Sequence, residues 1–283
     1  MKDLYPTRRK KKYSILNRID KVSYKKPSLL NNNQFDFYNK NGFLIVKNFF
    51  NKEIIQLAKK ECYDLFENNK KYYVNIEPKS NKVRSILGIH DNKYLFPLLD
   101  ERIINISESI LGDTVYLHQS RINYKDGRDS NGWNWHSDFE TWHSKDGMPR
   151  MRCLTAMIAI DDNTIKNGCV NFIPKSHLSY ISCPKVNNSS PEGEFSEQVE
   201  GVPDINSINT IKEKYNVDMF NAECFSGDLV LFDCNTLHYS DVNKTENKRT
   251  NIYFVLNSLE NKLIKPFNNE KHRPIEMGYY TNN

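Results

Sequence analysis

The chain has 283 residues, of which 38% are hydrophobic, 40 are lysine or arginine and 35 are aspartate or glutamate. No apolar run reaches the roughly 18 residues that a transmembrane helix needs, and the N-terminus lacks the apolar stretch of a signal peptide. These features predict a cytoplasmic protein with no membrane partner, long enough to bury one sizeable core. The six cysteines show no Cys-x-x-Cys spacing, which argues against a zinc site or a redox pair.

The net charge of +5 is distributed unevenly along the chain. Residues 1–26 contain ten lysines and arginines against two aspartates, whereas the remainder contains 30 basic and 33 acidic residues. A basic arm can bind nucleic acid or an anionic surface, but no nucleic-acid fold signature and no repeated aromatic pattern accompanies this one. We therefore expect residues 1–26 to form a solvated or loosely docked basic arm, residues 27–283 to form a single domain, and nucleic acid not to be a partner.

Three helices are predicted after this arm. Leu29–Lys40 has a helical pattern that stops at a glycine, and a short strand, Phe43–Val46, follows. Asn51–Lys71 carries apolar residues at helical spacing, and Tyr94–Leu111 forms a third helix that ends at Gly112. We expect these helices to cover one face of a sheet.

From Val115 onward the pattern is typical of strands. Five segments are rich in β-branched and aromatic residues and are separated by turn signals: Val115–Lys125, Arg150–Ile160, Cys169–Ile173, Asp228–Phe232 and Thr250–Leu256. Helices followed by many short strands indicate a mainly β fold, an antiparallel barrel or double sheet with helical buttresses. Residues 184–222 are polar and too numerous for an ordinary connection, so we expect a lid or an insertion there.

The strand predicted at Val115–Lys125 has one polar face. Its alternate positions are occupied by Gln119, Arg121, Asn123 and Lys125. Such a face either contacts solvent or lines a ligand cavity. The alternation alone does not distinguish the two, so a neighbouring site has to decide.

His136 and Asp138 form a pair with the spacing of metal ligands. Residues i and i+2 of an extended segment project from the same side of the backbone, so this imidazole and carboxylate can converge on one ion. The pair is a weak signal alone, because a surface loop can carry both residues by chance. His238, which follows the strand Asp228–Phe232, is a candidate third ligand, and Arg249 stands at the start of the next strand.

Two histidines and one carboxylate on neighbouring strands are the layout of a facial triad. This triad binds one face of Fe(II) and leaves the opposite face open for a co-substrate and dioxygen. The planar guanidinium of Arg249 is suited to hold the remote carboxylate of 2-oxoglutarate with two hydrogen bonds.

The sequence around the candidate ligands is long and specific: residues 135–152 read WHSDFETWHSKDGMPRMR. Shorter motifs accompany it, namely DLYPTR at 3–8, GFL at 42–44, HQSRINYK at 118–125, NG at 167–168, PKSH at 174–177 and RP at 273–274. With these motifs the chain resembles, over nearly its whole length, the phytanoyl-CoA dioxygenase superfamily of Fe(II)/2-oxoglutarate-dependent oxygenases and, within it, the ectoine hydroxylases. The resemblance implies a double-stranded β-helix (jelly-roll, cupin-like) core.

The same resemblance implies roles for individual residues. The catalytic metal ligands would be His136, Asp138 and His238. The 2-oxoglutarate-binding residues would be Arg249, Arg121 and Lys125. The substrate-binding residues would be Gln119, Thr141, Trp142, Asn123, Ser240 and Arg273. On this basis the polar strand face points into a cavity.

The activity implied is the hydroxylation of ectoine to 5-hydroxyectoine by a homodimeric enzyme, a step in compatible-solute synthesis. Fe(II) would be the cofactor, with 2-oxoglutarate and O2 consumed and succinate and CO2 released. An alternative is a related hydroxylase of another small polar metabolite, such as a free amino acid. A second alternative is a non-catalytic binding protein, against which the complete set of candidate ligands argues.

The chain departs from the family pattern next to two of these residues. Tyr239-Ser240-Asp241 follows His238, where the family usually has Gly-Ser-Asn, and Lys248 replaces the proline that usually precedes the arginine. A tyrosine side chain that pointed inward at position 239 would reshape the substrate pocket.

Overall fold

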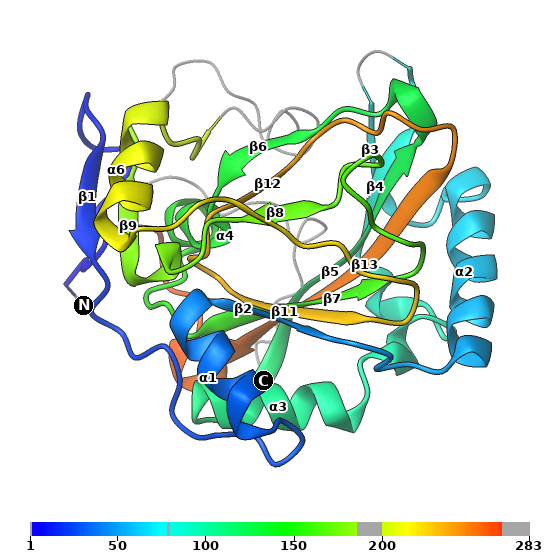
Figure 1. Ribbon diagram of the computed structural model, residues 1–283, viewed down its shortest axis with the longest axis horizontal. Coiled ribbons are helices and arrows are strands. Elements are labelled where there is room, and N and C mark those ends of the chain that lie inside the picture. Colours follow the sequence, from blue (N-terminus) through cyan, green and yellow to red (C-terminus); the bar gives the residue numbers. More distant parts are fainter. Residues whose placement is uncertain (1, 78–79, 186–199, 268–283) are drawn as a thin grey trace.

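The computed structural model describes residues 2–77, 80–185 and 200–267. Two antiparallel sheets form its centre, and helices pack on the outer side of the larger sheet (Figure 1). The predicted mainly β double sheet with helical buttresses is therefore confirmed. No helix in the described part of the chain is long and apolar enough to cross a membrane.

The larger sheet has seven strands in the order β2 (Phe43–Val46), β11 (Leu229–Asp233), β7 (Cys153–Ala159), β13 (Lys248–Ser258), β5 (Val115–Asp126), β4 (Val83–Leu87) and β3 (Tyr73–Ile76). The smaller sheet has four, in the order β10 (Phe220–Asn221), β8 (Val170–Phe172), β12 (His238–Ser240) and β6 (Trp133–His136). Side chains of the two sheets, including Phe172 and Phe232, form an apolar cluster between them. The cavity described in the next section opens beside this cluster.

The outer face of the larger sheet packs against α1 (Asn32–Asn41), α2 (Lys52–Glu67) and α3 (Glu101–Leu111) in one apolar core. α1 begins with a capping box, in which Asn31 and Gln34 each bond the other's backbone N–H, and it ends at Gly42 with φ of 81°. The predicted helix Tyr94–Leu111 is wrong at its start. Phe96–Leu98 is a separate turn of 3₁₀ helix, and α3 begins only after Asp100, whose carboxylate caps its first turn.

The predicted insertion at 184–222 has secondary structure of its own. Its described part contains α6 (Ile205–Tyr215) and β10, and α6 packs Ile208 and Ile211 into an apolar cluster with Ile173 and Ile181. Residues 186–199 lie outside the described residues. A role as a lid remains a prediction.

The N-terminal segment is not a solvated or loosely docked arm, and this expectation was wrong for the described residues from 2 to 26. β1 (Ser14–Asn17) pairs with β9 (Ser179–Ser182), and Tyr5 is fully buried in edge-to-face contact with Phe139 and Tyr180. Lysines 10 to 12 remain exposed. Tyr5, Arg8 and Arg18 have buried partners far along the chain, which charge composition does not reveal.

Candidate metal centre and active-site cavity

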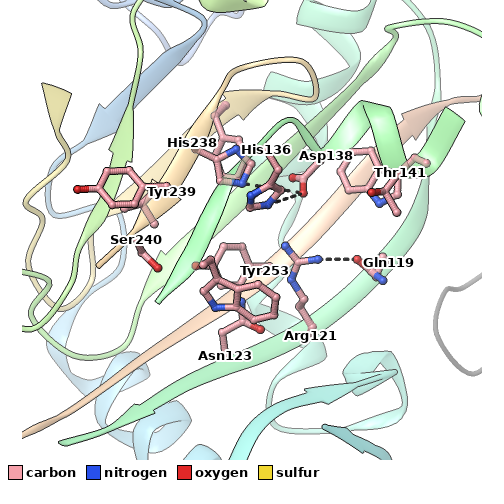
Figure 2. Close-up of a pocket in the computed structure, with 14 residues that line it drawn as sticks. Gln119, Arg121, Asn123, His136, Asp138, Thr141, His238, Tyr239, Ser240 and Tyr253 are labelled. Carbon is pink, nitrogen blue, oxygen red and sulfur yellow. Dashed lines mark hydrogen bonds and ion pairs between the residues drawn. The ribbon is translucent and has the colours of Figure 1, made fainter. Parts of the chain in front are cut away.

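The side chains of His136, Asp138 and His238 converge on one point, as Figure 2 shows. One ligand atom from each lies within 4.8 Å of the others, and all three residues are buried. Asp138 Oδ1 is 3.7 Å from His136 Nε2 and 3.9 Å from His238 Nε2. No other group of three histidine, cysteine or acidic side chains in the described part of the chain comes this close together.

Both imidazoles are oriented by the backbone. His136 Nδ1 donates to the Asn134 carbonyl at 2.7 Å, and His238 Nδ1 donates to the Thr236 carbonyl at 2.9 Å. This leaves each Nε2 lone pair directed at the common point, as metal-ligating histidines require. Burial lowers the pKa of His136 to about 3, with a further contribution from His238, and burial also lowers the pKa of His238. Both rings are therefore neutral.

The local structure that brings these ligands together differs in one respect from the prediction. His136 and Asp138 do not lie on one strand, because β6 ends at His136 and Asp138 is the first residue of the short helix α4 (Asp138–Thr141). Ser137 between them is extended, with φ of −108° and ψ of 138°, so the two side chains still project to the same side. His238 enters from β12, where it pairs directly with His136.

A cavity opens at the three candidate ligands. It contains about 740 Å³ of space between protein atoms, part of it open to solvent. Six of the residues predicted to bind substrate or co-substrate line it: Gln119, Arg121, Asn123, Thr141, Trp142 and Ser240. The polar face of β5 therefore points into the cavity and not into bulk solvent, as the resemblance implied.

Several polar atoms of the cavity have no partner in the described part of the chain. Arg121 Nη1 donates to Gln119 Oε1 at 2.7 Å, and its guanidinium lies 4.9 Å from the centre of the Tyr253 ring, but its Nε is unpaired. Asn123 Oδ1 and Ser240 Oγ are likewise buried without a partner. Buried polar groups in proteins are nearly always hydrogen-bonded, so these atoms suit a polar ligand.

Lys125 and Arg249 lie deeper than the cavity wall. They oppose each other in the β5–β13 ladder, on the same sheet face as Arg121 and Tyr253, but neither lines the cavity. Arg249 Nη2 donates to the Gly168 carbonyl at 2.9 Å, and Lys125 Nζ donates to the Asp241 carbonyl. Burial and the nearby guanidinium of Arg249 lower the pKa of Lys125 well below its ordinary value.

Trp142 is held by a π-helix that runs from Trp142 to Asp146. Asp146 Oδ2 lies 3.0 Å from His118 Nε2, and the His118 ring meets the Trp142 ring edge to face at 5.4 Å between centroids. π-Helical turns concentrate at functional sites. Here the turn places the indole, which is 2% exposed, in the cavity wall.

Comparison with known proteins agrees with this site and fold. The family model "Phytanoyl-CoA dioxygenase (PhyH)" matches residues 38–251. The chain belongs to the phytanoyl-CoA dioxygenase family. It is 35% identical to an ectoine dioxygenase of Stutzerimonas stutzeri, over 96% of this chain and 92% of that protein, and 34% identical to one of Nocardia farcinica, over 98% and 93%.

Solved structures agree with this family assignment, and structures of EctD match nearly the whole chain. The crystal structure of EctD from S. alaskensis with 2-oxoglutarate and 5-hydroxyectoine superimposes with a TM-score of 0.88 and 32% identity, covering 98% of this chain and 95% of that one. EctD with bound Fe gives a TM-score of 0.87. A carbocyclase of nogalamycin biosynthesis, SnoK, shares the fold at 17% identity and a TM-score of 0.62. The expected jelly-roll class is thereby confirmed.

Tyr239, where this chain departs from the family pattern, stands at the cavity but does not fill it. Its ring packs on Trp135 with centroids 4.4 Å apart, and it points away from the three candidate ligands (Figure 2). Because His238 and Tyr239 are adjacent on a strand, their side chains point to opposite faces. The departure therefore changes the rim of the cavity and leaves its centre unaltered.

Tyr253 and Trp133 are among the cavity residues that were not predicted from the sequence. Tyr253 lies on the same face of β13 as Arg249, four residues further along, so the two-residue period of a strand could have identified it. Trp133 stands three residues before His136, which normal alternation puts on the opposite face. A register shift between β12 and β6 brings it into the cavity, and no sequence signal marks that shift. Arg273 lies outside the described residues.

Proposed function

We propose that this protein hydroxylates ectoine to 5-hydroxyectoine with Fe(II) as cofactor, consuming O2 and 2-oxoglutarate and releasing succinate and CO2. The observation that carries the proposal is the buried set of His136, Asp138 and His238 in the wall of a cavity lined with polar side chains. Support for the substrate comes from relatives called ectoine dioxygenase that match nearly the whole chain. Support for the co-substrate comes from the related EctD structure, which holds 2-oxoglutarate and 5-hydroxyectoine.

The three ligands would be the catalytic residues, because they fit Fe(II) in number, type and protonation. Two neutral imidazole nitrogens and one carboxylate oxygen on one side of a point are the donor set of non-haem Fe(II) oxygenases. When bound, the iron supplies the activation of dioxygen that no protein side chain can perform. The chain's own part is to keep both Nε2 atoms unprotonated, which burial and the two backbone carbonyls achieve.

2-Oxoglutarate would extend from the metal toward Arg249 and Lys125, which lie behind the cavity wall on the same sheet face as Arg121. The Arg249 guanidinium and the Lys125 amine can both donate hydrogen bonds to the carboxylate of a dicarboxylate that is remote from the metal. Arg121 lies between them and the metal along β5, and its unpaired Nε would donate to the co-substrate. The backbone carbonyls of Gly168 and Asp241, which accept from Arg249 and Lys125, hold these side chains in place before the ligand arrives.

Ectoine carries a delocalised amidinium cation and a carboxylate on one ring. The Trp142 indole would hold the cation by a cation–π contact, worth about 0.5–2 kcal/mol when desolvated. The remaining polar contacts would come from residues of the cavity wall, namely Gln119, Thr141, Asn123 and Ser240. Arg273 would pair with the carboxylate. The aromatic side chains exclude water while these groups orient the ring.

The test is anaerobic reconstitution of the full chain with Fe(II), followed by 2-oxoglutarate and O2, with succinate measured in the presence and absence of ectoine. We expect succinate to form at a rate that depends on ectoine, together with a product heavier by one oxygen atom. If succinate forms slowly and ectoine does not change its rate, ectoine is not the substrate, and a panel of free amino acids tests the alternative. If Asp138→Ala retains full turnover, the iron assignment fails.

We propose further that the enzyme is a cytoplasmic homodimer and that residues 27–283, together with the docked N-terminal segment, act as one oxygenase domain. The single continuous larger sheet, which joins strands from Phe43–Val46 to Lys248–Ser258, supports one domain. Light scattering coupled to gel filtration would test the dimer, for which twice the 33.3 kDa chain mass is expected.

A further inference from the structure

Two arginines of the N-terminal segment are buried beside the two parts of the chain that carry the candidate metal ligands. The side chains of Arg8 and Arg18 are 1% and 3% exposed, and neither lines the cavity. Burial of a guanidinium is unfavourable unless it is paired and hydrogen-bonded. The partners of each arginine therefore show what the segment holds.

Arg8 binds Glu140, which follows Asp138 and precedes Thr141 on α4. Arg8 Nε donates to Oε1 of Glu140 at 3.0 Å and Arg8 Nη2 to Oε2 at 2.8 Å, and Thr7 Oγ1 donates to Oε1 at 2.7 Å. A bidentate pair fixes the orientation of the carboxylate as well as its distance. Residues two apart on a helix point to nearly opposite sides, so Arg8 holds α4 from the side away from the metal ligand. A helix of four residues needs such external support.

Arg8 is itself held firmly. Its backbone N–H donates to the Cys183 carbonyl at 2.8 Å, and its φ of 54° lies in the left-handed region, which persists only where the surroundings fix it. Its guanidinium also pairs with Glu200, and Lys145 Nζ lies 3.2 Å from the same carboxylate. Among the described residues, Arg8 pairs with both Glu140 and Glu200, and Lys145 adds a second cation at Glu200.

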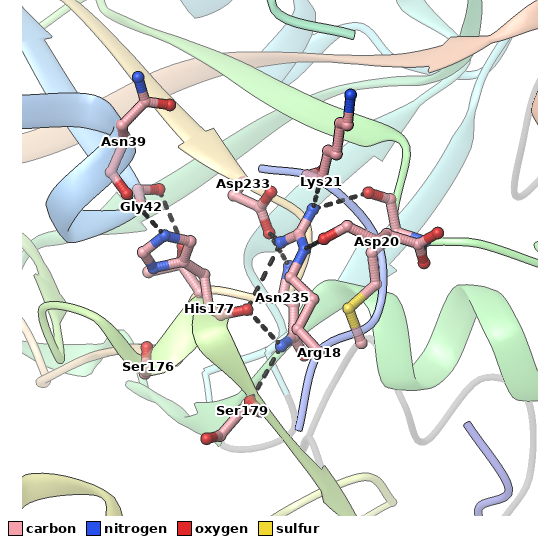
Figure 3. Close-up of polar contacts among 12 residues, drawn as sticks. Arg18, Asp20, Lys21, Asn39, Gly42, Ser176, His177, Ser179, Asp233 and Asn235 are labelled. Carbon is pink, nitrogen blue, oxygen red and sulfur yellow. Dashed lines mark hydrogen bonds and ion pairs between the residues drawn. The ribbon is translucent and has the colours of Figure 1, made fainter. Parts of the chain in front are cut away.

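Arg18 binds Asp233, at the end of the strand that precedes His238 in the chain (Figure 3). Its Nη1 donates to Asp233 Oδ1 at 2.8 Å, its Nη2 to the Met151 carbonyl at 2.8 Å and its Nε to the Asp20 carbonyl at 2.9 Å. Asp233 ends β11, and its Oδ1 also accepts from the Asn235 N–H at 2.9 Å. Arg18 therefore fixes the turn that leads from β11 to β12.

The two ligand segments are joined next to the partners of these arginines. The Phe139 N–H, one residue after Asp138, donates to the Cys234 carbonyl at 2.8 Å. In the turn before β12 the Thr236 N–H donates to the Asp233 carbonyl at 2.9 Å, and the Thr236 carbonyl accepts a hydrogen bond from His238 Nδ1. A displacement of either anchored carboxylate is thus transmitted through few bonds to a metal ligand.

We infer that the N-terminal segment is a positioning element of the metal centre. Arg8, through Glu140, and Arg18, through Asp233, hold α4 and the β11–β12 turn at the spacing that a three-ligand iron site needs. This inference rests on the proposed iron-dependent function. Removal of residues that orient metal ligands typically lowers metal affinity or activity by about 10–100-fold.

The experiment uses the full chain and measures Fe(II) affinity by anaerobic titration, together with the ratio of hydroxylated product to succinate. We expect Arg8→Gln to weaken Fe(II) binding by about tenfold and to lower the product ratio, and Arg8→Lys to restore part of both. Lys11→Gln is the matched control, because it removes one positive charge from an exposed position of the same segment. Its Fe(II) affinity and product ratio should equal those of the wild type.

Thr7→Val provides a second variant that leaves every buried charge paired and removes only one hydrogen bond to Glu140. It should weaken Fe(II) binding two- to threefold, and it decides the question if Arg8→Gln does not fold. All titrations are made well below the unfolding temperature and are expressed per folded molecule. If the variants lower only the Tm, while Fe(II) affinity and product ratio stay at the wild-type values, the inference fails. If the wild type neither binds Fe(II) nor consumes 2-oxoglutarate, the proposed function fails instead.

Discussion

The substitution Gly168→Ala tests whether Lys125 and Arg249, behind the cavity wall, bind 2-oxoglutarate. Gly168 has φ of 76°, and a Cβ placed there would lie well inside contact distance of the Asp241 carbonyl and 2.8 Å from Lys125 Nζ. The left-handed backbone costs about 1–2 kcal/mol for a residue other than glycine. Ordinary contact begins near 3.5 Å, so Lys125 Nζ would have to move by roughly 0.7 Å or more.

We expect two separate effects of this change. The free energy of unfolding should fall by about 3 kcal/mol, the upper part of the usual range for single substitutions. This loss corresponds to a Tm lower by about 6–12 °C. The KM for 2-oxoglutarate should rise about tenfold, equivalent to about 1.4 kcal/mol, because displaced cations no longer match the remote carboxylate. The KM for ectoine should change little.

Gly88→Ala is the matched control for backbone strain. Gly88 has φ of 78°, but a Cβ there would meet only His90 Cε1, at 3.9 Å. The same backbone strain should lower the free energy of unfolding of this variant by about 1–2 kcal/mol, and hence its Tm by about 2–8 °C, while the KM for 2-oxoglutarate stays at the wild-type value. If both variants lower the Tm but Gly168→Ala leaves that KM unchanged, the assignment of Lys125 and Arg249 to 2-oxoglutarate is refuted.

Three further outcomes are expected. Asp138→Ala should abolish Fe(II) binding and turnover, while the free energy of unfolding, measured by denaturant titration, stays within about 1 kcal/mol of the wild type. A large loss of stability would instead make Asp138 a structural residue. Lys125→Met should raise the Tm at neutral pH and weaken 2-oxoglutarate binding. Burial lowers the pKa of Lys125, so at neutral pH the unfolded wild-type chain binds a proton at Lys125 more readily than the folded chain does, which destabilises the wild type. The Tm advantage of the variant should therefore shrink as the pH approaches 10.5, the ordinary pKa of lysine. Tyr239→Gly should cost about 1–2 kcal/mol through lost packing on Trp135 and strand glycine entropy, yet keep kcat for ectoine within about threefold, and a larger change would show that Tyr239 contacts the substrate.

The sequence predicted the parts of the fold and site that depend on local pattern. The alternation of Gln119, Arg121 and Asn123 identified one face of a strand, and the structure places all three in the cavity wall. His136 and Asp138 were paired by their spacing, which holds even though a helix begins at the second residue. Only a few residue types bind metal ions, so the sequence offers few candidate ligands.

The remainder depends on contacts between distant residues. Trp133 reaches the cavity only because β12 and β6 shift register, and a register is a property of two strands together. The burial of Arg8 depends on Glu140, which lies 132 residues away. From composition alone Arg8 is one of many basic residues of a predicted solvated arm, because a local sequence pattern does not show which distant carboxylate binds it.

The docking of the N-terminal segment also sets an order of events during synthesis. Tyr5, Arg8 and Arg18 leave the ribosome well before Tyr180, Glu140 and Asp233, the residues that they contact in the folded chain. Until then the segment has no partner and stays exposed. A nascent chain that ends before Asp233 lacks both His238 and the second anchor, so it should not retain iron. The same exposure makes this segment of a growing chain a site at which chaperones or proteases act before the metal centre closes.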